Sequence, residues 1–190
     1  MTDIIKDTSD IIQGIFRHQG QQDYLGENVT MAEHMMQAAH QAEEMGCDAL
    51  TITGALLHDI GHFTSAFGTF SMADTKDRYH EDAGADVLKG RFPDEVIACV
   101  QHHVAAKRYL CATDAEYYEG LSDASRHSLS LQGGPMSPDE VAAFAQTPHL
   151  DRILTVRRCD DGGKIAGGET PPLGHFIAIM ERVLHEYHQS

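Results

Sequence analysis

Signals that start and stop α-helices recur along this chain, and they constrain its fold more than any other feature. Thr30 and Glu33 form a capping box, in which each residue bonds to the backbone of the first helical turn. Asp48 is suited to cap the next helix, and Ser137 with Glu140 forms another capping box. The alternation of apolar and polar residues that indicates a surface strand is missing. The sequence therefore predicts an all-α fold.

The predicted helices follow from these signals and from the glycines and prolines between them. They cover residues 3–18, 31–45, 49–60, 80–89, 93–110, 148–160 and 173–187, with two shorter helices after Thr113 and Ser137. Residues 62–79 are expected to form a loop. A chain of 190 residues fits one domain, so we expect a single bundle-like domain over residues 1–190.

Charge and composition exclude several kinds of partner. The formal net charge is −15, and so acidic a surface repels nucleic acid and anionic membranes. No stretch approaches the roughly 18 unbroken apolar residues of a membrane helix, and the N-terminus does not resemble a signal peptide. The four cysteines form no C-x-x-C pair, which is typical of reduced thiols, so we expect a cytoplasmic protein. The sequence predicts no particular oligomeric state.

Histidine is unusually frequent, with 13 residues against 14 for lysine and arginine together. Residues of metal-ligand type occur on successive predicted helices, namely His34, His58, Asp59, His80, the pair His102 and His103, and the pair Asp160 and Asp161. Helical bundles build metal sites from side chains that project inward from facing helices. Imidazole and carboxylate ligands suit first-row transition metals. One ion does not need so many ligands, so Asp59, with two oxygens, is the natural bridge between two ions.

This order of histidine, His-Asp, histidine, histidine and aspartate resembles the HD superfamily, and the resemblance extends from His34 to Asp161. Most members of that superfamily are phosphohydrolases. Four segments instead resemble its small oxygenase branch, namely YLGENVTMAEH, HDIGH, HVAAKRYL and RRCDDGGK. That branch includes myo-inositol oxygenase and enzymes that oxidatively cleave carbon–phosphorus bonds, among them the glycine-forming 2-amino-1-hydroxyethylphosphonate dioxygenases. The resemblance implies an HD-domain helical bundle that holds two Fe ions as an Fe(II)/Fe(III) pair.

The resemblance also implies which residues hold each iron. The first ion would be held by His34, His58, Asp59 and a terminal aspartate, and the second by Asp59, His80 and one histidine of the 102–103 pair. We prefer His103 to His102, because it directly precedes the V-A-A-K segment. Asp160 and Asp161 flank the apolar face of their helix almost equally. The spacing from the aspartate to a downstream lysine, compared with that in myo-inositol oxygenase, favours Asp160. Analogy with the phosphonate branch favours Asp161, which is our prediction.

Basic residues near the ligands predict a pocket for an anion. Lys107 lies one helical turn beyond His103, and Arg157 and Arg158 precede the terminal aspartate by three or four residues. His62 follows the His-Asp pair at a similar distance. Cationic donors of this kind bind anions with several oxygens, such as a phosphonate. Among them, Lys107, Arg158 and His62 are our predicted substrate contacts.

Tyr24 and Glu27 lie in the segment before the first ligand helix, at a spacing that matches the pattern of the resembled branch. The resemblance implies that Glu27 pairs with a substrate ammonium and that the Tyr24 phenol approaches an iron. Ser125 is also expected to line the substrate pocket. Tyr24, Glu27, His62 and Lys107 are thus assigned to catalysis, while Glu27 and Ser125 also join the substrate contacts.

The expected reaction is the O2-dependent cleavage of the carbon–phosphorus bond of 2-amino-1-hydroxyethylphosphonate, which gives glycine and phosphate. The expected partners are therefore a small organophosphonate and O2. An alternative is a metal-dependent HD phosphohydrolase that uses the same ligands on a phosphate ester or nucleotide. A non-catalytic HD module that binds a nucleotide and regulates a partner fits less well, because the ligand set looks complete.

Overall fold

The computed structural model describes residues 2–24, 27–64 and 79–189. Over these residues the chain forms helices joined by short loops, with a single β-bridge between Asp23 and Thr30. The helices are α1 (Thr2–Gln19), α2 (Met31–Glu44), α3 (Ala49–Leu57), α4 (Gly61–Thr64), α5 (His80–Leu88), α6 (Asp94–Thr113), α7 (Ala115–Glu119), α8 (Asp123–Leu131), α9 (Pro138–Phe144), α10 (Leu150–Gly162) and α11 (Leu173–Gln189). The all-α prediction is confirmed.

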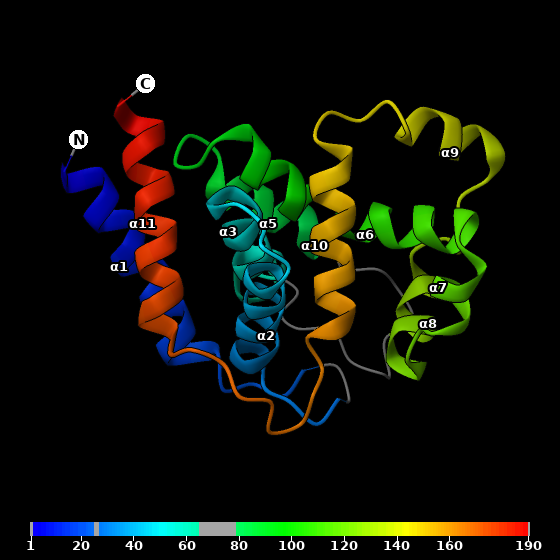
Figure 1. Ribbon diagram of the computed structural model, residues 1–190, viewed down its shortest axis with the longest axis horizontal. Coiled ribbons are helices and arrows are strands. Elements are labelled where there is room, and N and C mark those ends of the chain that lie inside the picture. Colours follow the sequence, from blue (N-terminus) through cyan, green and yellow to red (C-terminus); the bar gives the residue numbers. More distant parts are fainter. Residues whose placement is uncertain (1, 25–26, 65–78, 190) are drawn as a thin grey trace.

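Helices α2, α3, α6 and α10 pack against one another at the centre of the molecule (Figure 1). α1 and α11 lie side by side at one end, near both termini, and α7, α8 and α9 lie at the other end. The central helices are joined by the fully buried side chains of Met35, Leu56, Val100 and Val156. Removing such apolar surface from water is the main force that holds the bundle together. The same four helices carry or border most of the predicted ligands.

Most helix ends follow the signals in the sequence. Thr30 and Ser137 form complete capping boxes, and the Asp48 side chain accepts from the backbone of α3. Thr113 was also expected to form a capping box with Glu116 at the start of the short helix that follows it, but α6 continues through Thr113 and Asp114 caps α7 instead. In the predicted 62–79 loop, residues 62–64 belong to α4, and residues 65–78 lie outside the described part of the chain.

Two glycines allow α4, α5 and α6 to approach closely. A Cβ atom on Gly61 would lie 1.8 Å from the carbonyl oxygen of His80, and one on Gly84 would lie 2.8 Å from Val100 Cγ1. Neither position has room for a larger side chain without a shift of its neighbours. These contacts bring Gly61, which closely follows His58 and Asp59, next to the start of α5.

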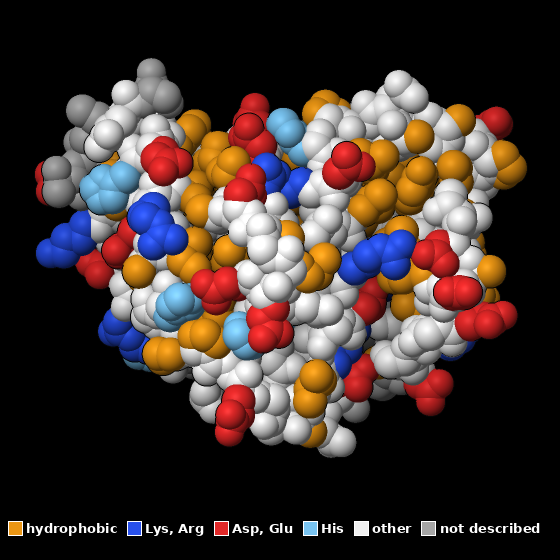
Figure 2. Space-filling model, in the orientation of Figure 1, with side chains coloured by type: hydrophobic (Ala, Val, Ile, Leu, Met, Phe, Trp, Pro, Cys, Tyr) orange, Lys and Arg blue, Asp and Glu red, His pale blue; other side chains and the backbone are white. Residues whose placement is uncertain are grey.

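The exposed surface carries charges of both signs. Acidic side chains are spread over the face seen in Figure 2 and are not gathered in one patch. Among the described residues, no helix is long and apolar enough to cross a membrane.

Candidate metal centre

Four buried histidines from different parts of the bundle meet at one point. His34 projects from α2, His58 ends α3, His80 begins α5, and His103 lies in the middle of α6. Their Nε2 atoms form two close pairs, with 3.0 Å between His34 and His58 and 2.9 Å between His80 and His103. The four predicted histidines therefore occupy a single site.

Backbone carbonyl groups fix which nitrogen of the His34 and His58 rings carries the proton. His34 Nδ1 lies 2.9 Å from the Gly163 oxygen, and His58 Nδ1 lies 2.7 Å from the Ala55 oxygen. A carbonyl oxygen only accepts, so each Nδ1 must donate and each neutral ring presents a bare lone pair at Nε2. Two lone pairs 3.0 Å apart repel each other unless a proton or a metal ion lies between them.

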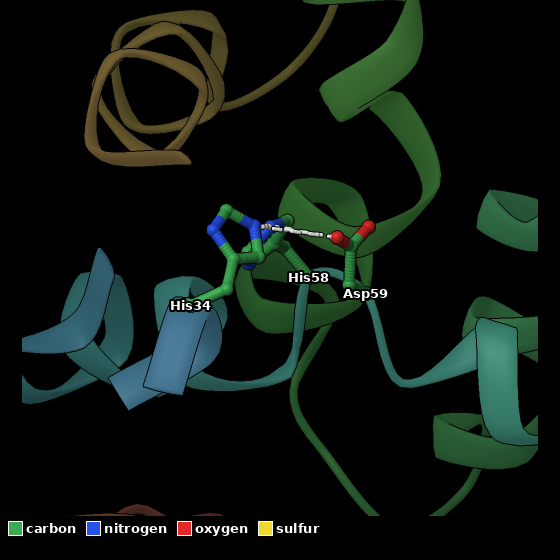
Figure 3. A group of neighbouring side chains, drawn as sticks. All are labelled: His34, His58 and Asp59. Atoms are coloured by element: carbon green, nitrogen blue, oxygen red, sulfur yellow. Dashed lines mark hydrogen bonds and ion pairs between the residues drawn. The ribbon is translucent and has the colours of Figure 1, made fainter. Parts of the chain in front are cut away.

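Asp59 stands between the two histidine pairs and presents one oxygen to each. Its Oδ2 atom lies 3.3 Å from His58 Nε2 and 3.4 Å from His34 Nε2. Its Oδ1 atom lies 3.3 Å from the Nε2 atoms of both His80 and His103. Figure 3 shows the Asp59 carboxylate facing the rings of His34 and His58. This arrangement has the geometry of a bridging carboxylate.

The structure places Asp160, and not the preferred Asp161, in the cluster. Asp160 Oδ1 lies 3.4 Å from His34 Nε2, and its Oδ2 lies 3.7 Å from His58 Nε2. Successive residues of a helix point about 100° apart, so the next side chain faces elsewhere. Asp161 accepts from Tyr117 Oη at 2.5 Å and from Arg157 Nε at 3.0 Å.

Of the adjacent histidines His102 and His103, only His103 lies in the cluster, and His62 lies at its edge. His103 lies in the cluster, whereas His102 is partly buried and places its ring 6.1 Å from that of Phe144. His62 lies beside the second pair, with Nε2 3.7 Å from Asp59 Oδ1 and its ring stacked 4.0 Å from the His80 ring.

These residues fit two transition-metal ions. Ligand atoms about 2.1 Å from an octahedral ion lie about 3 Å apart, close to the separations seen in the cluster. Two groups of suitable ligands share Asp59, one with His34 and His58 and the other with His62 and His80. Asp59 Oδ2 and Asp160 Oδ1 are buried and have no hydrogen-bond partner among the described residues. Buried carboxylate oxygens of this kind require a cation or a donor.

The charges in the cluster also favour a cation. Burial acts to lower the pKa of His58, but the carboxylates of Asp59 and Asp160 outweigh it and raise that pKa to about 9. At the other pair, burial lowers the pKa of His103 to about 4. The first pair therefore holds positive charge even without a metal, while His103 stays neutral and able to bind one.

A pocket adjoins the cluster and is lined by most of the predicted substrate contacts. The predicted residues that line it are Tyr24, Glu27, His62, Lys107 and Ser125. Arg158 does not reach the pocket, because its side chain is 49% exposed and pairs with Asp114 at 2.9 Å. The buried Arg157 lines the pocket in its place. Arg157 and Asp160 are three residues apart on α10 and therefore share a face of that helix.

Three cations surround this pocket. Lys107 Nζ donates to Ser128 Oγ at 2.8 Å, and burial lowers the pKa of Lys107 to about 7. Arg157 pairs with the Asp160 carboxylate at 2.5 Å. Lys164, which was not among the predicted substrate contacts, donates to Ser125 Oγ at 3.0 Å. Its only signal in the sequence was its place at the end of the RRCDDGGK segment.

The segment before α2 covers another side of the pocket. The Tyr24 ring stacks on His34 with 3.8 Å between ring centroids. Burial, together with the nearby Asp160 and Asp59, raises the pKa of Tyr24 well above its usual value, so the phenol is neutral here. Glu27 accepts from Ser122 Oγ at 2.8 Å, which ties this segment to the start of α8.

An all-α bundle that surrounds a His/Asp cluster of this order has the architecture of a metal-binding HD protein. The sequence model of the HD domain matches residues 31–143, which contain the four clustered histidines and Asp59. The chain therefore belongs to the HD domain family.

Curated relatives place the chain more narrowly. The glycine-betaine-forming dioxygenase of 1-hydroxy-2-(trimethylamino)ethylphosphonate from Leisingera caerulea is 56% identical, over 94% of this chain and 91% of its own length. Hydroxymethylphosphonate dioxygenase from Gimesia maris is 41% identical, over 86% of this chain and 82% of its own. An uncharacterized protein of Acanthamoeba polyphaga mimivirus is 36% identical, over 98% of this chain and 85% of its own length. Within the HD family, the chain thus belongs with the phosphonate dioxygenases.

Proposed function

We propose that this chain is a di-iron oxygenase that uses O2 to cleave the carbon–phosphorus bond of a 1-hydroxyphosphonate. The observation that carries the proposal is the position of Asp59, which offers one carboxylate oxygen to each of two buried histidine pairs. The adjoining pocket contains the cations that a phosphonate needs. The names of the curated relatives support the same chemistry.

The proposed ligands follow from the contacts in the cluster. His34, His58 and Asp160 would hold one ion, His80 and His103 would hold the other, and Asp59 would bridge them. An iron pair held there would supply a Lewis acid for the substrate oxygens and an Fe(II) ion to activate O2, while the electrons that reduce O2 would come from the substrate.

Lys107, Arg157 and Lys164 would bind and orient the phosphonate. Arg157 already pairs with two aspartates, so much of its charge is compensated inside the protein. Lys107 has three N–H donors, and Ser128 accepts only one in the described structure. The remaining donors can point to phosphonate oxygens. Such charge-assisted bonds would fix C1 of the substrate beside the metal ligands.

Glu27 would select a substrate with positive charge next to the hydroxyl-bearing carbon. Ser122 occupies its Oε1 atom, which leaves the other carboxylate oxygen for a cation. One candidate is 2-amino-1-hydroxyethylphosphonate, which would give glycine and phosphate. The relative from Leisingera caerulea supports a second candidate, the trimethylammonium form, which would give glycine betaine. Both place a positive nitrogen at the same distance from C1.

A test of the proposal compares hydroxyphosphonates with and without O2. Protein purified and loaded with iron under anaerobic conditions would receive hydroxymethylphosphonate or either of the two nitrogen-containing phosphonates. We expect O2 uptake that matches phosphate release, with the highest kcat/KM for a substrate that carries the positive nitrogen. Phosphate release from a phosphate ester at the same rate without O2 would refute the oxygenase and support the phosphohydrolase alternative.

A further inference from the structure

The three residues that follow α10 contact the metal cluster, the pocket and α2 in turn. We call residues 163–165 the strap. The Gly163 carbonyl accepts from His34 Nδ1 at 2.9 Å, and Lys164 Nζ donates to Ser125 Oγ at 3.0 Å. The backbone of Ile165 makes two hydrogen bonds to the side chain of Gln37. One short segment thus orients a proposed ligand and a proposed substrate contact.

Gln37 holds the strap through both ends of its amide. Its Nε2 atom donates to the Ile165 oxygen at 2.8 Å, and its Oε1 atom accepts from the Ile165 nitrogen at 2.9 Å. Gln37 is buried and lies three residues after His34, so both side chains project from the same face of α2. The paired bonds fix the position and the direction of the Ile165 peptide groups relative to His34.

The strap also lies directly against the backbone of α2. A Cβ atom on Gly163 would lie 2.9 Å from the His34 oxygen and 3.0 Å from the Ala38 nitrogen. Glycine permits this approach, which brings the Gly163 carbonyl within reach of the His34 ring. No other described hydrogen bond ties Ile165 to α2. Apart from the bond between Gly163 and His34, the described hydrogen bonds between the strap and α2 are therefore those of Gln37.

We propose that Gln37 is a positioning residue of the metal centre, because it keeps the Gly163 carbonyl under His34 Nδ1 and Lys164 at the pocket. A fixed acceptor at Nδ1 keeps the proton on that nitrogen and leaves Nε2 free to bind a metal. The inference rests on the proposed function only in treating His34 as a ligand. Loss of such an outer hydrogen bond typically weakens metal affinity or activity about 10- to 100-fold.

The test replaces Gln37 by methionine, which is similar in length but has no amide. The matched control is Gln41→Met, one turn further along α2, where the glutamine Oε1 atom has no hydrogen-bond partner among the described residues. Fe(II) affinity would be measured anaerobically for both ions. We expect Gln37→Met to weaken one of the two ions about 10- to 100-fold and Gln41→Met to leave both within about twofold. Equal affinities in the wild type and Gln37→Met would overturn the inference.

A second readout does not depend on iron. In metal-free protein, proton NMR should show a His34 Nδ1–H signal that is protected from exchange in the wild type and in Gln41→Met. We expect that protection to be lost in Gln37→Met, and retained protection would count against the inference. If Gln37→Met does not fold, Gln37→Glu decides, since it keeps an acceptor for the Ile165 nitrogen but loses the donor to its oxygen. Reduced protection there supports the inference, and wild-type protection overturns it.

The two proposals can fail separately. A wild-type protein that binds metal but cleaves phosphonates without O2 would end the proposed oxygenase and leave the role of Gln37 intact. A wild-type oxygenase whose metal affinity and Nδ1–H protection are unchanged in Gln37→Met would end the inference and leave the proposed function intact.

Gln37→Met should also raise KM for the phosphonate, because Lys164 moves with the strap.

Discussion

The Nε2 atoms of His34 and His58 lie 3.0 Å apart, although the Nδ1 atom of each ring donates to a backbone carbonyl. Neither neutral ring has a proton to give to the other, so the pair is stable only around a positive charge. Asp59 and Asp160 add negative charge to the same space. The fold therefore creates a strong local demand for a cation before any metal binds.

This demand predicts that metal binding releases protons. The carboxylates around His58 raise its pKa to about 9, so the metal-free pair holds a proton at neutral pH. A metal ion must displace that proton, and the affinity should therefore rise with pH up to about 9. Titration of metal-free protein with metal at pH 7.5 in weak buffer would measure the release. Metal binding with no proton release at that pH would contradict the tautomers assigned to these two rings.

The adjacent aspartates Asp160 and Asp161 provide a matched pair of variants. Asp160→Asn should weaken or lose the ion near His34, because this carboxylate lies 3.4 Å from His34 Nε2. Asp161→Asn should keep both ions and instead raise KM, because Asp161 holds Arg157 at the pocket. Metal analysis and steady-state kinetics separate the two effects. The reverse pattern would restore Asp161 as the ligand.

Lys107 and Arg158 form a second matched pair. Lys107→Met should raise KM for a hydroxyphosphonate roughly 10- to 100-fold with unchanged metal content, since a charge-assisted bond contributes about 1.5–3 kcal/mol. Arg158→Met should change KM little, because this side chain is half-exposed and pairs with Asp114. An unchanged KM in Lys107→Met would remove this lysine from the substrate pocket.

The pH dependence of anion binding should follow Lys107. Burial and the neighbouring Arg157 lower its pKa to about 7, so the ammonium is present below that pH and is lost above it. Binding of a phosphonate to metal-free protein should weaken as pH rises through about 7, and the difference between wild type and Lys107→Met should shrink over the same range. Calorimetry at several pH values would measure it. A constant difference up to pH 9 would show that the lysine stays charged.

Glu27 should affect the choice of substrate without affecting the metals. Glu27→Gln keeps the acceptor for Ser122 Oγ but removes the negative charge, so kcat/KM should fall for phosphonates with a positive nitrogen. Hydroxymethylphosphonate has no such nitrogen and serves as the control substrate. If both kinds of substrate lose activity equally, Glu27 has a structural role in the segment before α2.

The sequence predicted the parts of this site that depend on local signals. Capping signals placed the helices that carry His34 and His58, and the large number of ligand-type residues led to the prediction that Asp59 bridges two ions. Asp160 and Asp161 were equivalent on a helical wheel. Their roles depend on Tyr117, 44 residues away in sequence, which binds Asp161, and on Arg157. Such distant contacts have no local signal.

The pocket was predicted less completely for a similar reason. Lys164 lies outside any helix, so periodicity says nothing of where its side chain points. Its position depends on the strap and on Gln37, 128 residues away from Ile165 in sequence. Arg158 was preferred to Arg157 as a substrate contact. In the structure Asp160 faces the cluster, and Arg157, three residues before it on α10, lies on the same face and lines the pocket.

The metal content of Asp59→Ala tests most directly whether Asp59 bridges two irons. The wild type, loaded anaerobically and desalted, should retain two irons per chain and show a coupled Fe(II)/Fe(III) signal in electron paramagnetic resonance. Asp59→Ala should lose both irons and all O2-dependent phosphate release, since each ion loses one ligand oxygen and the charge that joins the histidine pairs. An Asp59→Ala protein that retains two irons per chain and the coupled signal would contradict the account.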